Sequence, residues 1–359
     1  MKKSVTILLP DAGVKPAGGF KIALDYANAL SDAGYQVHVV YACTILLARQ
    51  SLYMKIKMSL RWFKYIFNYS AKEWHPLKNN IKEHFVFSLN YRNVPKTSIY
   101  VATAAGTSVY LNQYPIDARN KFYLIQDYET WCNSDEFLRE TYHYAMKKIV
   151  ISNWLKDIIS GQEKEQCHVV PNGFNPHLYK ISIPIREKDK YSISMLYNDR
   201  PQKDMATGLK ALEHVHDIIP QIKVHLFGTG KNHPTFPEWI EYHYRPSKEE
   251  HLFINNKCAI YLGSSKEEGW GLTVGEAMMC GQAVVCTNNR GYLEMVNPDS
   301  NALVCNVGDY RGLSENIVRL INDDELRYSI AYNGFVSIQN FKEDKSAKMF
   351  VSLIEQTLK

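Results

Sequence analysis

Two glutamates frame the part of the sequence that is best suited to bind a phosphate-bearing sugar. Glu268 and Glu276 have seven residues between them, among them Gly269 and Gly271. Glycines let the backbone approach a ligand closely, and the N–H groups at the start of a helix attract phosphate oxygens. Carboxylates accept hydrogen bonds from sugar hydroxyls. A diphosphate between the two glutamates would therefore place one of them near each sugar of a nucleotide-sugar.

The surroundings of this pair favour a ligand site over the plainer alternative of two solvated charges. An apolar stretch at 258–262 predicts a buried strand, and a helix pattern begins at about 271. The segment therefore predicts a strand, a glycine-rich loop and a helix N-terminus, in the order that phosphate sites use.

Two basic residues, Arg200 and Lys203, are placed to neutralise such a diphosphate. They follow a predicted strand at 192–197 and open a predicted helix at 203–217. The charge that grows on a diphosphate leaving group needs a metal or fixed cations. We find no Asp-x-Asp motif in a suitable context, so we expect protein cations here, with no metal and no cofactor. The alternative is that both residues are exposed loop charges.

The first half of the chain contains a Gly-Gly pair at a second strand-to-helix turn. Gly18 and Gly19 stand between a predicted strand at 4–9 and a predicted helix at 19–33. Their amides can face a phosphate, although such a pair is more often a simple loop. The preceding loop, 11–16, is expected to contribute to the same site.

Polar residues also gather after the predicted strand 121–125. They are Gln126, Asp127, Tyr128 and Glu129. Gln126 cannot act as a general base, whereas Asp127 or Glu129 could orient or deprotonate an acceptor hydroxyl. The alternative for Asp127 is a turn or capping residue.

These residues require a scaffold of alternating strands and helices. The further predicted strands are 36–41, 98–102, 148–151, 167–170, 222–227, 282–286 and 302–305, and the further helices are 309–321, 324–338 and 343–357. Several strands are apolar without alternation, as expected for parallel strands buried on both faces. Alternation of this kind predicts βαβ units and doubly wound sheets.

A proline-rich and charged stretch around 171–190 divides the chain. We expect an α/β protein with two Rossmann-like domains, 1–175 and 176–342, whose doubly wound parallel sheets face a cleft. The last helix, from about 343 to 359, is expected to pack back on the first domain.

Composition narrows the class of protein. Hydrophobic residues make up 45% of the 359 residues and the formal net charge is +5, which is ordinary for a globular protein and does not favour nucleic-acid binding. No apolar run is long enough for a membrane span. The seven scattered cysteines predict thiols in a reducing compartment, so we expect a cytoplasmic protein without a zinc site.

The segment from Glu268 to Gly281 resembles the signature of the large retaining family of GT-B glycosyltransferases that is often called family 4. That signature reads E-G-[FW]-G-L-x-x-x-E-A-M-x-x-G. Similarity extends to 171–175, 227–230, 282–285, 290–294 and 301–304. It covers the second domain well and the first thinly.

The resemblance implies a role for each residue named above. Glu268 would hold hydroxyls of the donor sugar, and Glu276 would bind the ribose hydroxyls. Arg200 and Lys203 resemble the family's Arg…Lys pair, although two residues separate them where the family usually has about four. The residues implied to surround the donor sugar and phosphates are Gly18, Gly19, Gly269, Trp270, Gly271, Leu272 and Thr273.

On the acceptor side the family often carries His-Asp, where this chain has Gln126 and Asp127. The Gln-Asp-Tyr-Glu form resembles rhamnosyltransferase-like members. The family is thought to retain the anomeric configuration by front-side attack, in which a donor phosphate oxygen takes the acceptor proton. The resemblance thus implies transfer of a hexose-type sugar from a UDP- or dTDP-sugar to a saccharide or lipid-linked acceptor, in bacterial cell-surface polysaccharide or glycoconjugate synthesis.

A basic aromatic stretch at 49–72 contains six Lys or Arg and no Asp or Glu. Its apolar and basic residues fall on different helical faces, which is typical of a helix that lies on anionic lipid. Such a helix would place the protein at the inner face of the membrane. The alternative is an ordinary helix whose apolar face belongs to the core.

Three other functions use some of the same features. A GT-B nucleotide-sugar epimerase would need acid and base side chains that we cannot place. A nicotinamide-dependent dehydrogenase would need a G-x-G-x-x-G with a downstream acid. An inactive nucleotide-sugar-binding partner subunit would not need both Glu268 and Glu276.

Overall fold

The computed structural model describes residues 3–11, 17–46, 51–65, 70–160, 167–231 and 235–356. The chain divides into two compact units, Met1–Pro171 with Asp344–Lys359, and Asn172–Glu343. Two predicted segments fall partly outside the described residues. They are residues 12–16 of the loop that precedes Gly18 and Gly19, and Arg49 and Phe67 of the basic stretch.

The first unit is built on a seven-stranded sheet in the order β3-β2-β1-β4-β5-β6-β7, whose pairings are all parallel. The strands are β1 (Ser4–Leu9), β2 (Gln36–Ala42), β3 (Lys82–Val86), β4 (Ile99–Ala102), β5 (Lys121–Ile125), β6 (Lys147–Val150) and β7 (Cys167–Val169). The central strands β4 and β5 are buried along their whole length. This is why their sequences are apolar without alternation.

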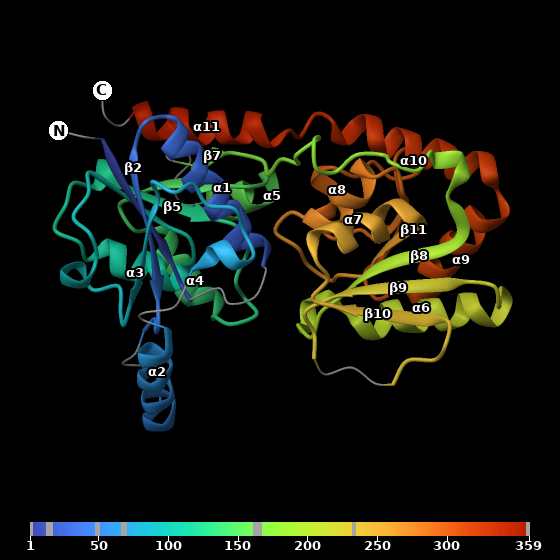
Figure 1. Ribbon diagram of the computed structural model, residues 1–359, viewed down its shortest axis with the longest axis horizontal. Coiled ribbons are helices and arrows are strands. Elements are labelled where there is room, and N and C mark those ends of the chain that lie inside the picture. The colour runs from blue at the N-terminus through green and yellow to red at the C-terminus, as the bar shows by residue number, and fades with distance from the viewer. Residues whose placement is uncertain are drawn as a thin grey trace. The chain divides into compact units, whose positions relative to one another are not determined.

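Helices accompany this sheet (Figure 1). They are α1 (Gly18–Asp32), α2 (Leu52–Tyr65), α3 (Ala105–Asn112), α4 (Asp135–Tyr142), α5 (Asn153–Ser160) and the C-terminal α11 (Glu343–Gln356). Phe350 of α11 is fully buried and stacks on Tyr26 of α1 with 4.1 Å between ring centroids. The last segment of the chain therefore completes the core of the first unit.

The second unit has a six-stranded parallel sheet in the order β10-β9-β8-β11-β12-β13. The strands are β8 (Asp189–Tyr197), β9 (Lys223–Gly228), β10 (Ile240–Tyr244), β11 (Cys258–Gly263), β12 (Ala283–Thr287) and β13 (Leu303–Cys305). The helices are α6 (Met205–Ile218), α7 (Lys248–Lys257), α8 (Leu272–Met279), α9 (Tyr310–Asn322) and α10 (Asp324–Ile338).

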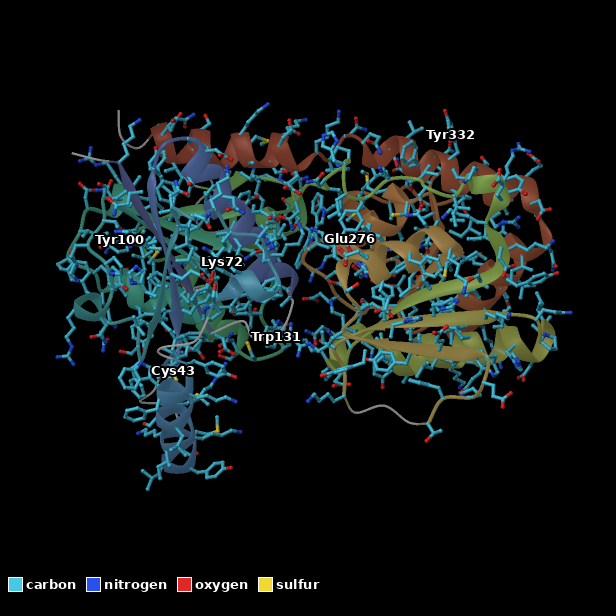
Figure 2. All side chains as sticks on the ribbon, in the orientation of Figure 1. Cys43, Lys72, Tyr100, Trp131, Glu276 and Tyr332 are labelled. Atoms are coloured by element: carbon cyan, nitrogen blue, oxygen red, sulfur yellow. The ribbon has the colours of Figure 1, made fainter. Side chains whose placement is uncertain are left out.

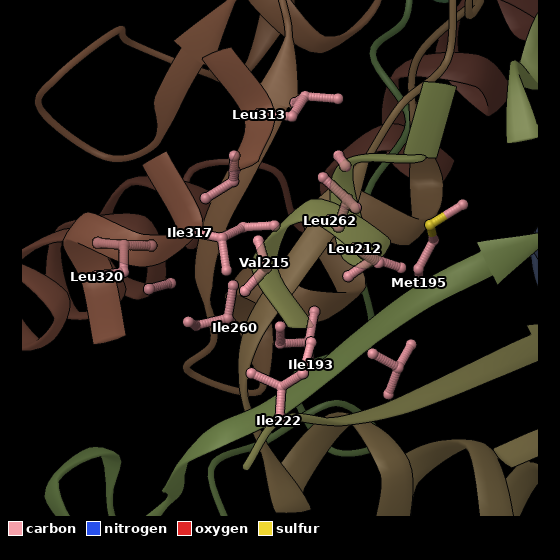
Figure 3. Close-up of a cluster of buried hydrophobic side chains, with 14 of the residues drawn as sticks. Ile193, Met195, Leu212, Val215, Ile222, Ile260, Leu262, Leu313, Ile317 and Leu320 are labelled. Atoms are coloured by element: carbon pink, nitrogen blue, oxygen red, sulfur yellow. The ribbon is translucent and has the colours of Figure 1, made fainter. Parts of the chain in front are cut away.

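One hydrophobic core unites α6 and α9 with a face of this sheet (Figure 3). Ile193 and Ile260 from the sheet, Val215 from α6 and Ile317 from α9 are each fully buried in it. Burial of such side chains contributes roughly 1.5–3 kcal/mol each. The core therefore fixes β8 and β11 side by side, and the loops that follow these two strands carry most of the predicted donor site.

The predicted fold class is confirmed, since both units are α/β with parallel sheets. The prediction omitted β3 and β10, each of which lies at the edge of its sheet. Edge strands are only half covered, and both contain charged or histidine side chains where the central strands are apolar. They lack the continuous apolar run that identified the other strands.

Helix α2 projects from the rest of the first unit (Figure 1) and none of its residues is buried. Its apolar stripe, Leu52, Ile56, Leu60 and Phe63, is 57–74% exposed. The alternative that this stripe belongs to the core is therefore wrong. The side that does contact the unit is aromatic, with Trp62 near Phe87 and Tyr65 near Phe85.

Candidate active site

The predicted donor residues gather where the strand order of the second sheet reverses, between β8 and β11. Lys203 ends a 3₁₀ turn, η7 (Pro201–Lys203), after β8, and Glu268 lies in the loop after β11. Ligands of open parallel sheets bind beyond the carboxyl ends of the strands at such a switch point. The topology therefore brings together two residues that are 65 positions apart in the sequence.

Lys203 and Glu268 form an ion pair in which Nζ lies 2.6 Å from Oε1. Their side chains are only 15% and 11% exposed, so water screens the pair less than it would at an open surface. Backbone contacts hold the two loops together, since Lys266 N donates to Gln202 O at 2.7 Å and Ser264 Oγ to Lys203 O at 3.1 Å.

A short hydrogen-bond chain holds the Glu268 carboxylate from the other side. Ser265 Oγ donates to Glu268 Oε1 at 2.7 Å, and the buried Tyr292 hydroxyl lies 3.1 Å from Ser265 Oγ. Tyr292 also packs against the loop backbone, because a Cβ on Gly271 would lie 2.4 Å from its ring. Gly271 also has φ +94°. Both the positive φ and the lack of room for a Cβ favour glycine at this position.

Glu276 of α8 is buried, and its carboxylate accepts a hydrogen bond from a tyrosine hydroxyl. Tyr179 Oη donates to Glu276 Oε1 at 2.7 Å, and Glu276 is 7% exposed. Figure 2 labels Glu276 in the second unit. His251 of α7 packs near the ring of Tyr179. Burial lowers the pKa of His251, against the opposing effect of Glu276, so this imidazole is neutral at pH 7. A buried carboxylate beside neutral donors is suited to bind hydroxyls.

The start of α8 offers backbone groups rather than side chains. The side chain of Trp270 is 2% exposed and packs edge-on against Phe341, so only its backbone is available to a ligand. Thr273 accepts a 2.7 Å hydrogen bond from the Tyr261 hydroxyl. Gly269 and Leu272 lie in the same loop-to-helix turn, directly after Glu268.

Arg200 lines a hollow of about 470 Å³. The hollow is lined by residues 197–201 and 204–206 and by Lys266. Asp204 in this lining precedes α6 with the left-handed φ of +46°, and its side chain accepts a hydrogen bond from Thr207 Oγ1 at 2.8 Å. The structure thus joins Lys203 to Glu268 and leaves Arg200 at the neighbouring rim.

In the first unit, the strand order reverses between β1 and β4. Gly18 and Gly19 open α1 after β1, and Gln126 follows β5. Gln126 Nε2 donates to Gly19 O at 3.0 Å, and a Cβ on Gly19 would already contact the Gln126 amide. The Gly-Gly turn and the polar loop after β5 are therefore parts of one cluster.

Glu129 lies at the N-terminus of α3, where both its oxygens accept from Ala105 N at 3.2 and 3.3 Å. Burial raises the pKa of Glu129 to about 7, although the Ala105 hydrogen bond opposes the shift; Asp127 adds to it. Asp127 accepts from the Tyr128 amide at 2.9 Å. A carboxyl with a pKa near 7 is suited to proton transfer, and Glu129 has this property.

Comparison with known proteins identifies the second unit. Residues 180–336 match the family model described as glycosyl transferases group 1. Residues 180–336 are therefore similar to this family, and this stretch is here called the group 1 domain. The Lys203–Glu268 pair and Glu276 all lie within it.

Two curated proteins are similar to part of this chain. The uncharacterized glycosyltransferase MJ1178 of Methanocaldococcus jannaschii is 26% identical over 208 residues, which cover 55% of this chain and 56% of the relative. The N,N'-diacetylbacillosaminyl-diphospho-undecaprenol alpha-1,3-N-acetylgalactosaminyltransferase of Campylobacter jejuni is 26% identical over 117 residues, 33% and 31% of the two chains. The chain therefore spans about half or less of the length of these relatives.

Solved structures share the fold over the whole chain. HepE of Anabaena in complex with UDP-glucose has a TM-score of 0.73 at 17% identity and covers 99% of both chains. Sucrose-phosphate synthase of Thermosynechococcus elongatus has a TM-score of 0.71 at 15% identity, again with 99% coverage of both. The fold is therefore of the GT-B type, with the group 1 domain as its second unit.

Several residues of the second unit that support the site were not identified from the sequence. They are Tyr179, His251, Tyr261, Ser265 and Tyr292. Each acts through a contact with a residue at least three and up to 97 positions away. Short-range motifs do not record such contacts.

Proposed function

We propose that this protein is a retaining glycosyltransferase that moves a hexose-type sugar from a UDP-sugar to an acceptor hydroxyl, without a metal. The observation that carries the proposal is the partly buried Lys203–Glu268 pair at the switch point of the group 1 domain. The fold shared with HepE, which was solved with UDP-glucose, supports a nucleotide-sugar donor and favours UDP over dTDP.

In this proposal the donor diphosphate takes over Lys203 from Glu268. Two phosphate groups offer more negative charge than one carboxylate, and the amides at the start of α8 add donors for them. Glu268, still bound by Ser265, then accepts hydrogen bonds from the donor-sugar hydroxyls. Glu276 accepts from the ribose hydroxyls, with Tyr179 holding its carboxylate in place.

The transfer step breaks the bond between the sugar C1 and the phosphate oxygen and forms a bond from C1 to the acceptor oxygen. The acceptor proton passes to the departing diphosphate, which leaves as UDP. Lys203, with Arg200 at the rim, stabilises the charge that grows on the leaving group. In the first unit, Asp127 and Glu129 bind and orient the acceptor hydroxyl, with Gln126 and Tyr128 beside them.

We further propose that the acceptor is a saccharide carried on a lipid, and that α2 binds the anionic membrane surface. The exposed stripe of α2 stands beside Lys55, Lys57 and Lys64, and α2 contains no acidic residue. Figure 2 shows the α2 side chains standing out from the first unit. None of the described helices has the length and apolar character needed to span a bilayer.

Relatives support a role in cell-surface polymers. The Campylobacter relative is named for a diphospho-undecaprenol acceptor, and CapM of Staphylococcus aureus, named for capsular polysaccharide biosynthesis, is 31% identical over 88 residues. These cover 24% of this chain and 23% of CapM.

The anomeric configuration of the product tests the proposed reaction. Purified protein is incubated with UDP-hexoses and lipid-linked saccharides, and the product is analysed by NMR. We expect an axial donor linkage to give an axial product linkage. An inverted product would exclude front-side transfer, and release of no UDP with any acceptor would contradict the enzymatic assignment.

A further inference from the structure

A second cluster of polar side chains lies on the edge of the sheet in the second unit, away from the loops that carry the donor residues. His225 of β9 stands opposite Glu241 of β10 in the strand register, and His243 follows two positions after Glu241. Side chains two apart on a strand point to the same face. Val224 and Leu226 point to the opposite face and belong to the core, so the three polar side chains share the other face.

The nitrogen and oxygen atoms of this cluster converge. His225 Nδ1 lies 3.2 Å from His243 Nε2 and 3.3 Å from Glu241 Oε2, and His243 Nε2 lies 3.6 Å from Glu241 Oε1. In a tetrahedral zinc site with metal–ligand distances of about 2.0–2.1 Å, neighbouring ligand atoms are about 3.3–3.4 Å apart. The two histidine nitrogens and the Glu241 carboxylate therefore lie at about the spacing of three corners of such a site.

His243 has the tautomer that metal binding through Nε2 requires. Its Nδ1 lies 2.8 Å from Glu250 Oε1 on α7, and a carboxylate can only accept, so Nδ1 carries the proton. Nε2 then presents a lone pair to the centre of the cluster. Metal-binding histidines usually donate their other ring N–H to a carboxylate in this way.

The remaining groups suit an ion that enters from solvent. Metal binding uses the Nδ1 lone pair of a neutral His225, whose other ring nitrogen, Nε2, then carries the proton. His225 is 4% exposed, whereas the Glu241 side chain is 64% exposed. The buried histidine forms the floor of the cluster and the glutamate its solvent side.

We propose that His225, Glu241 and His243 bind one zinc-class transition-metal ion, with Glu250 as the hydrogen-bond partner of His243 and a fourth position open to solvent. Two histidines and a carboxylate are ligands that Zn²⁺ prefers. The ion would join β9, β10 and the first turn of α7 and so stabilise this edge of the sheet. The proposal does not depend on the transfer reaction.

The test is a Co²⁺ titration of the chelator-treated, dialysed full chain, followed by visible absorption and by metal analysis, with Zn²⁺ as competitor. We expect one Co²⁺ per chain with the strong absorption of a four-coordinate site, displaced by Zn²⁺. E241Q and H243Q should weaken Co²⁺ binding at least tenfold, and E250Q by about 10- to 100-fold. Glu241 is largely exposed, so E241Q leaves the packing intact.

A matched control is available in the first unit, where His38 Nδ1 lies 2.8 Å from His84 Nε2 on neighbouring strands. Among the described residues, these two histidines belong to no group of three metal-ligand side chains. H84Q should therefore bind Co²⁺ as the wild type does. The proposal is overturned if the wild type binds no stoichiometric Co²⁺, if E241Q and H243Q bind it unchanged, or if H84Q removes the binding.

Discussion

Lys203 Nζ lies 2.6 Å from Glu268 Oε1, and the two residues come from the loops after neighbouring strands at the switch point of the second sheet. This pair keeps a cation and an anion partly buried in the absence of a ligand. In the proposed reaction Lys203 meets the donor diphosphate and Glu268 a sugar hydroxyl. The site is therefore largely preorganised, which is the condition for electrostatic catalysis.

Replacement of Lys203 should act mainly on turnover. In the proposed reaction Lys203→Ala removes the cation that stabilises the leaving group, so kcat should fall by about a hundredfold or more. It also leaves Glu268 without its ionic partner. The control is Lys210→Ala, since Lys210 is an exposed residue of the following helix and should leave steady-state kinetics unchanged. A turnover number within threefold of wild type for Lys203→Ala would remove this residue from the site.

Glu276 should govern the affinity for the nucleotide. Glu276→Ala is expected to raise the calorimetric Kd for UDP tenfold or more, because a charge-assisted pair is lost. Tyr179→Phe removes only the phenol that orients the carboxylate, so a smaller increase is expected. Glu213→Ala, an exposed position on α6, serves as the control. Equal Kd values for wild type and Glu276→Ala would contradict the ribose assignment.

The raised pKa of Glu129 predicts a pH dependence of the rate. With a pKa of about 7, the carboxylate fraction falls about tenfold for each pH unit below 7. If the carboxylate orients or deprotonates the acceptor, kcat/KM should fall on the acid side with an apparent pKa near 7. Glu129→Gln should be slow and lack this limb, whereas Glu136→Gln should keep it. An acid limb that persists in Glu129→Gln would assign it to another group.

The same shift predicts a pH dependence of stability. The folded protein binds this proton more tightly than the unfolded chain, whose value is 4.5. The stabilising contribution is thus fully present below about pH 4.5 and is lost as pH rises through about 7. Denaturation of wild type and Glu129→Gln across this range should show the loss only in the wild type. Parallel curves for the two proteins would mean that Glu129 titrates normally.

Helix α2 should bind anionic vesicles through its exposed stripe. Wild-type protein is expected to co-sediment with phosphatidylglycerol vesicles at low salt and to be partly released at high salt. The double variant Ile56→Ser, Leu60→Ser should lose most of this binding, whereas Tyr332→Ser, at an exposed aromatic residue of α10, should not. Absence of wild-type binding at low salt would exclude the membrane role of α2.

The strand and helix order was predictable because central parallel strands are apolar throughout and most helices carry regular apolar patterns. Helix α10 and the strands β8 to β13, apart from β10, lie within a few residues of their predicted positions. The edge strands β3 and β10 were not predictable in this way, because their sequences contain charged and histidine side chains and lack a continuous apolar run.

Some residues of the candidate site were also predictable from the sequence, and others were not. The loop from Glu268 to Leu272 and the helix with Glu276 follow from local glycine and helix patterns. The partners that hold them do not, because Tyr179 and Tyr292 are ordinary aromatic residues until the fold places their hydroxyls on Glu276 and Ser265. The converging His225 and His243, 18 residues apart, are likewise visible only once β9 and β10 pair.

Binding of the donor is the central claim, and thermal melts against a panel of UDP-, dTDP-, GDP- and ADP-sugars test it most directly. A ligand at about one hundred times its Kd stabilises the folded state by about 2.7 kcal/mol, which gives a measurable shift. We predict that UDP-sugars raise the melting temperature of the wild type and not that of Glu276→Ala. No shift with any donor, or an equal shift in Glu276→Ala, would contradict the assignment of the donor site.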